Sequence, residues 1–199
     1  MLSKDNLNFM TQELNGEIER LRNLLQSVEV TLEPQAGATE REISEVERQT
    51  GIKFDENLKA FYRFSNGSNY ETWFATNTAP CSFLSLEEAL KEWARARQFE
   101  ERRNADYEGY EEEKPRDERI KQNVWADRGW FPLGEFNGFS TVIYYDAAPS
   151  ETGKYGQVIV YQHDPDTMSY FAENFLQFFK KSNDLIEQDP EEIAMLYNL

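Results

Sequence analysis

Apolar residues near the start of the chain recur at steps of three and four, which is the spacing of one face of a helix. The residues of this stripe are Leu7, Met10, Leu14, Ile18, Leu21 and Leu25. They predict a helix over about residues 3–26. Such a stripe can pack on the chain's own core or on a partner helix, and we favour the core.

Two Ser/Thr-x-x-Glu patterns precede further apolar faces and are typical of capping boxes at helix starts. The first runs from Thr39 to Glu42, and its helix is expected to end at Gly51. The second runs from Ser85 to Glu88 and predicts a helix through about Arg103.

Shorter helices are predicted by single capping residues. Asp55 can cap a helix that ends at Asn66-Gly67, because both of these residues tolerate positive φ. Asp189 followed by Pro190 favours a short helix near the end of the chain, since proline suits the first helical position.

The stretch from Trp130 to Phe179 changes to β-branched and aromatic runs separated by glycine and proline, which is the pattern of strands and turns. Strands are predicted at about 130–134, 141–145 and 157–162, and two shorter ones at about 70–74 and 81–84. A turn at 163–166 and an apolar helix over about 172–181 complete the stretch. We expect a meander of antiparallel strands with a helix packed on it.

The charge balance narrows the classes of partner. The chain of 199 residues has 37 acidic and 21 basic residues, a net charge of −16. This charge repels nucleic acid and anionic membrane, because both are bound through Lys and Arg. It attracts a basic protein and speeds its association, although an acid excess can also serve solubility alone.

Compartment and membrane association follow from other features of the sequence. The single cysteine, Cys81, excludes an internal disulfide and suits a reducing cytoplasm. We expect a cytoplasmic protein, with neither a membrane-spanning run nor a signal peptide.

Residues with catalytic or metal-binding potential are few. His163 is the only histidine and stands in a turn beside Asp164-Pro165-Asp166, where Asp and Pro have ordinary turn roles. Cys81 has no base near it in sequence, and no phosphate-binding, nucleophile-elbow or calcium-loop motif occurs. We expect no cofactor, no metal and no enzymatic activity, and the remaining alternative is an unrecognised pair of carboxylates.

Residues 105–118 contain seven acids, two bases and no periodic apolar signal. We predict a mobile acidic loop over about 104–119, within a single domain of residues 1–199 that has an N-terminal helix within 1–30 and an acidic extension over 182–199.

Four segments together resemble the SUKH superfamily, which contains fungal cell-wall-assembly regulators and many bacterial toxin-immunity proteins. They are 38–54, 58–67, the Trp-Phe-Pro-Leu-Gly run at 130–134, and the stretch from Asp146 through Phe171-Ala172. The usual Leu-Pro before the second helix is replaced by Phe54-Asp55.

The resemblance implies an α+β fold, a single domain with helices packed around one antiparallel β-sheet, and it implies no catalytic residues. Its recurring residues are expected to be structural: Asn66, Gly67, Trp130, Pro132, Asp146, Pro149, Gly153 and Gly156.

The resemblance and the charge together predict a protein-binding domain. The first hypothesis is a bacterial immunity protein that neutralises a basic toxin, often a nuclease. The alternative is a regulatory or scaffolding protein of the cell-wall-assembly type. Candidate partner-binding residues combine exposed aromatic groups with acids: Tyr70, Trp73, Asp106, Tyr107, Glu108, Tyr110, Glu111, Glu112 and Glu113. The sequence does not decide the oligomeric state.

Overall fold

A computed structural model describes residues 11–107, 110 and 115–197 of the chain. Over these residues it contains seven helices and one sheet of six antiparallel strands, so the fold class is α+β as predicted. The helices are α1 (Gln12–Ser27), α2 (Glu40–Thr50), α3 (Glu56–Phe64), α4 (Leu86–Gln98), α5 (Glu100–Ala105), α6 (Phe175–Gln188) and α7 (Pro190–Tyr197).

The sheet is a simple meander, in which each strand pairs with the next one along the chain, in the order β1-β2-β3-β4-β5-β6. Its strands are β1 (Thr72–Ala75), β2 (Pro80–Phe83), β3 (Trp130–Phe136), β4 (Thr141–Asp146), β5 (Gln157–Gln162) and β6 (Thr167–Ala172). The sheet therefore has two edges, β1 and β6, at opposite ends.

The helix starts follow the local capping chemistry. Both predicted capping boxes are present, at Thr39 and at Ser85, each with the reciprocal contact from its glutamate. The carboxylate of Asp55 accepts from two backbone N–H groups at the start of α3. Gly51 ends α2 in the left-handed region, at φ 76°.

Several predicted boundaries differ from the structure: α3 ends at Phe64, before Asn66-Gly67, and the helix predicted through about Arg103 is divided into α4 and α5. The α1 helix begins after the cap Thr11, and the part of the predicted helix before it lies outside the described residues. The helix predicted from about residue 172 begins at Phe175, because Asn174 caps it. The preceding residues form β6, a strand that the sequence pattern did not predict.

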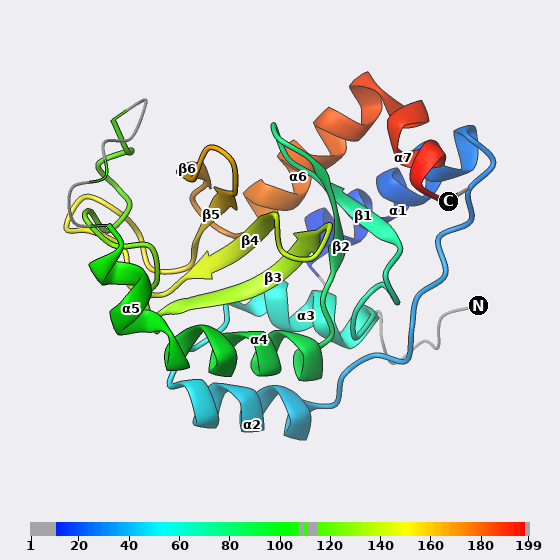
Figure 1. Ribbon diagram of the computed structural model, residues 1–199. Helices are drawn as coiled ribbons and strands as arrows, with labels where there is room; N and C mark the ends of the chain where they lie inside the picture. The colour runs from blue at the N-terminus through cyan, green and yellow to red at the C-terminus, as the bar shows by residue number, and fades with distance from the viewer. Residues whose placement is uncertain (1–10, 108–109, 111–114, 198–199) are drawn as a thin grey trace.

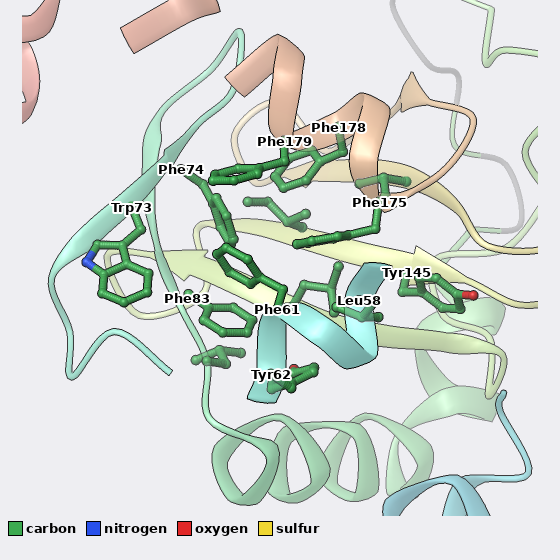
Figure 2. Packing of buried hydrophobic residues seen from close by; sticks show 14 of the residues in the cluster. Leu58, Phe61, Tyr62, Trp73, Phe74, Phe83, Tyr145, Phe175, Phe178 and Phe179 are labelled. Atoms are coloured by element: carbon green, nitrogen blue, oxygen red, sulfur yellow. The ribbon is translucent and has the colours of Figure 1, made fainter. Parts of the chain in front are cut away.

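The main core lies on one face of the sheet, where aromatic side chains of α3 and α6 meet those of the strands (Figure 2). Phe61 of α3 is central, with its ring about 5.0 Å from those of both Phe83 and Phe179. The apolar stripe of α1 is buried against α6 and α7 and belongs to the chain's own core. Figure 1 shows α1, α6 and α7 grouped on one side of the molecule and α2 beside α4 on the other.

A second, smaller cluster covers part of the other sheet face. Its buried members include Ile120, Trp125, Trp130, Val142 and Ile159. The connection between α5 and β3 supplies the first two, so the part of this connection around Ile120 and Trp125 packs against the strands.

Candidate partner-binding surface

The turn between α3 and β1 presents an aromatic side chain to solvent. Ser68 and Glu71 close this turn, with the Glu71 N–H donating to the Ser68 carbonyl at 3.1 Å. The Ser68 hydroxyl donates to the Glu71 carbonyl, and its backbone N–H donates to Phe83 of β2 at 2.9 Å. The turn is thereby fixed to the second strand of the sheet.

The two central residues of this turn both have positive φ, 52° at Asn69 and 69° at Tyr70. Asparagine tolerates this region, whereas a bulky aromatic residue adopts it at a cost of about 1–2 kcal/mol. The Tyr70 side chain is 78% exposed, so its packing within the chain does not offset that cost. Strain of this kind is concentrated at functional sites, which makes Tyr70 the strongest of the predicted contact residues.

Two acidic residues lie at or near this turn, Glu71 next to Tyr70 in sequence and Glu33 close enough to act on Glu71. Glu71 is half-buried, and burial raises the pKa of its carboxyl, with a further contribution from the negative charge of Glu33. Glu33 is exposed. We call Glu33, Asn69, Tyr70 and Glu71 the Tyr70 patch. An aromatic group beside carboxylates is suited to a partner surface that carries Lys or Arg.

Trp73 must be removed from the predicted contact residues. Its side chain is 0% exposed and packs between Phe61, Phe64 and Phe83 in the main core (Figure 2). The whole of β1 is buried on both faces, so the aromatic residues that follow Tyr70 serve the core.

The other predicted contacts lie at the opposite end of the sheet. Asp106 is exposed, but Tyr107 and Tyr110 are half-buried and pack against Trp125 in tilted and edge-on arrangements, at 5.0 and 5.1 Å between ring centroids. The Tyr110 hydroxyl donates to the carbonyl of Asp166, in the turn between β5 and β6, at 3.1 Å. Glu108, Glu111, Glu112 and Glu113 lie outside the described residues.

Arg116 anchors the same segment. It is 8% exposed and donates to the carbonyl oxygens of Lys121 and Val124 at 3.0 and 2.6 Å, and its guanidinium lies over the rings of Tyr107 and Trp125. The described part of the predicted acidic loop is therefore held in place by packing and hydrogen bonds. Tyr70, which precedes β1, and Tyr110, which contacts the β5–β6 turn, do not form one site.

The residues of the 146–157 turn have structural partners. Asp146 is 0% exposed, and its carboxylate accepts from the Ala148 N–H and the Gln157 side-chain amide at 2.9 and 2.8 Å. Burial raises the pKa of Asp146 to about 6. A Cβ at Gly153 would lie 2.3 Å from the Arg119 carbonyl, so only glycine allows this close approach.

The remaining family-motif residues also lie in packed positions. The side chain of Asn66 accepts from the N–H of Leu86, at the start of α4, at 2.9 Å. Gly67 has a φ of 92° and lies against the backbone of Ser85. Trp130 is buried, and Pro132 pairs with Tyr144 where the register of β3 and β4 shifts. Pro149 lies against Gly153.

The reactive side chains have ordinary environments. His163 is exposed and shares a 2.8 Å hydrogen bond with Asp166, which raises the pKa of the imidazole. Cys81 is buried, and burial raises the pKa of its thiol, which disfavours the reactive thiolate. Within residues 11–107, 110 and 115–197, no group of three His, Cys, Asp or Glu side chains is placed to hold a metal ion. No described helix combines the length and apolar character needed to cross a bilayer.

Comparison with known proteins agrees with this architecture. The sequence model of the SMI1 / KNR4 family (SUKH-1) matches residues 37–181. A KNR4/SMI1 homolog of Kluyveromyces lactis is 42% identical over 65 residues, which are 32% of this chain and 12% of that protein. The chain thus aligns with only a small part of that relative.

Proposed function

Because the chain belongs to the SMI1/KNR4 family (SUKH-1), we propose that it is a non-enzymatic protein-binding domain that acts in the cytoplasm as an immunity protein. Its partner is a basic toxin domain, and the Tyr70 patch is the contact surface. The bound toxin is neutralised because its own cationic surface is covered.

The observation that carries this proposal is the strained and exposed Tyr70. Folding places an aromatic ring in solvent, with φ at 69°, where glycine would be more stable. Tyrosine is a frequent interface anchor, since it buries a large area while losing little rotamer freedom. Because Ser68 holds the turn to β2 by hydrogen bonds, the backbone that carries Tyr70 is already ordered before the tyrosine binds.

The net charge of −16 supports a basic partner. A nuclease that meets nucleic acid through Lys and Arg presents the opposite charge, and complementary fields raise the association rate. Glu33 and Glu71 provide local negative charge at the patch, where it can pair with those cations.

The test begins with the affinity-tagged chain in lysate of the source organism, eluted across a salt series, with identification by mass spectrometry. A toxin candidate is then co-expressed with the chain and scored for restored growth. Tyr70→Ala is expected to lose capture and rescue, whereas Tyr155→Ala, which removes another exposed tyrosine, is expected to retain both. Equal capture and rescue by the two variants would contradict the Tyr70 patch as the contact.

The similarity to the Kluyveromyces lactis protein favours a second candidate, a regulatory or scaffolding protein of the cell-wall-assembly type. Its partner would be a signalling or biosynthetic protein, and charge need not dominate the contact. Binding that persists at high salt to such proteins, without any rescue from a toxin, would favour this alternative.

A further inference from the structure

A groove of about 420 Å³ lies between α4, α5 and the sheet face opposite the main core. The strands contribute an apolar floor that includes Trp130, Val142 and Tyr144. The β3–β4 turn closes one side with Phe139, and Ala96 faces the groove from α4. This volume accommodates one or two large side chains.

Phe99, at the junction of α4 and α5, is 46% exposed at the mouth of the groove. The surrounding aromatic side chains are half-buried or buried, so the hollow is apolar inside and open at its edge. Large exposed aromatic groups are rare in this chain: among the described residues only Tyr70, Phe99 and Tyr155 have this character. Phe99 is the only one of the three that borders this groove.

The rim of the groove has the opposite charge to the molecule as a whole. Arg95, Arg102 and Arg103 line it, against Glu92 and Asp106. Arg95 pairs with Glu92 at 3.3 Å, and the guanidinium of Arg103 lies 5.5 Å from the ring centre of Tyr161. No described carboxylate forms an ion pair with Arg102, which is exposed. A net positive rim is unexpected where acids outnumber bases by 37 to 21.

We propose that this groove binds a segment of a protein partner in which a large apolar side chain stands beside one or two carboxylates. The apolar side chain enters the hollow between Phe99 and the strands. The carboxylates pair with Arg102 and Arg95 at the rim. This segment is acidic, whereas the partner surface proposed to bind the Tyr70 patch is basic. The proposal for the groove does not depend on the Tyr70 contact.

Charge complementarity selects this occupant. A basic segment would meet three guanidinium groups against two carboxylates, one of which already pairs with Arg95, so the rim repels it on balance. A wholly apolar segment would leave the rim unused, whereas an acidic one can accept from Arg102 without displacing an existing partner among the described residues. Exposed ion pairs contribute little to affinity, so the apolar anchor supplies most of it and the arginines select the charge.

The probe is the peptide acetyl-Asp-Phe-Glu-Glu-amide, titrated into the full chain by calorimetry at about 50 mM salt, where surface charges are weakly screened. Acetyl-Lys-Phe-Lys-Lys-amide tests the charge, and acetyl-Asp-Ala-Glu-Glu-amide tests the anchor. Amide resonances of isotopically labelled protein locate the binding site. Indole-3-acetate, a small aromatic carboxylate, tests whether the groove takes a small molecule instead of a peptide segment.

Two variants, each with a matched control, locate the contact. Ala96→Trp fills the groove from α4, and Ala94→Trp places the same side chain on the exposed part of the same helix, outside the groove. Arg102→Glu reverses the rim charge, with Arg41→Glu on α2 as the exposed control. Thermal unfolding of each variant confirms that it is folded.

The acidic phenylalanine peptide is expected to bind the native chain, Ala94→Trp and Arg41→Glu alike. Its binding should be lost in Ala96→Trp and weakened about fivefold in Arg102→Glu. The proposal is overturned by absence of peptide binding, by equal binding of the lysine or alanine peptide, by unchanged binding in Ala96→Trp, or by binding of indole-3-acetate alone. The Tyr70→Ala variant should bind the peptide normally, so failure here is distinguishable from failure of the proposed function.

Discussion

Replacing Gly156 by alanine should destabilise the fold through two separable effects. Gly156 has a φ of 84°, which an L-residue adopts at a cost of about 1–2 kcal/mol. A Cβ there would also lie 2.7 Å from the hydroxyl oxygen of Tyr145, closer than nonbonded atoms approach. Tyr145 is buried and cannot swing into solvent.

Displacing Tyr145 has consequences at a distance in sequence. Its hydroxyl donates to the Lys53 carbonyl at 3.2 Å and accepts from the Asp55 N–H at 3.1 Å, directly before α3. Overpacking of a core typically costs about 1–3 kcal/mol. Adding the backbone strain gives an expected loss of about 2–5 kcal/mol for Gly156→Ala. Gly156→Val should lose more, because its branched side chain enters the same space.

Gly51→Ala is the matched control. Gly51 has a similar φ of 76°, but nothing lies within 4 Å of the position that its Cβ would take. This variant should lose only the backbone contribution of about 1–2 kcal/mol. Urea denaturation of both variants, followed by circular dichroism, measures the difference in the free energy of unfolding. If the two losses agree within about 0.5 kcal/mol, the steric role assigned to Gly156 is wrong.

Two further predictions concern Tyr70 and Asp146. Tyr70→Gly should raise the free energy of unfolding by about 1 kcal/mol, because glycine adopts positive φ without strain. Its affinity for the partner should fall. A loss of stability in urea denaturation would contradict the argument from strain. The pKa of Asp146 is raised from 3.8 to about 6. Protonated Asp146 therefore adds up to about 3 kcal/mol to the free energy of unfolding. This contribution is fully present below about pH 3.8 and is lost as the pH rises through about 6. Asp146→Asn should flatten the stability profile between about pH 4 and 6, measured by urea denaturation at several pH values, and an unchanged slope would contradict the assignment.

Local chemistry made much of the fold predictable. The capping boxes at Thr39 and Ser85 and the stop at Gly51 depend on residues within one helical turn, and all are present. The strands β4 and β5 were predicted from their alternating and β-branched runs, because this pattern is also local in sequence. The strand β6 was missed in part because its last residue, Ala172, adjoins the apolar helix and was included in it.

The candidate site was less predictable, because exposure depends on distant residues. Trp73 follows an exposed tyrosine in sequence, yet helices and strands remote in the chain bury it. Tyr107 and Tyr110 stand among acids, but Trp125 and Arg116 provide their packing partners. Tyr70 itself was predicted by residue type, whereas its positive φ and the nearby Glu33 emerge only from the folded turn.

The central claim is that the Tyr70 patch binds a basic toxin domain, and calorimetry with the captured and purified partner tests it most directly. Affinity should fall by about 30-fold in Tyr70→Ala, as for an interface anchor worth about 2 kcal/mol, and should fall steeply between about 50 mM and about 500 mM salt. Tyr155→Ala should bind as the native chain does. An affinity that is insensitive both to Tyr70→Ala and to salt would contradict the account.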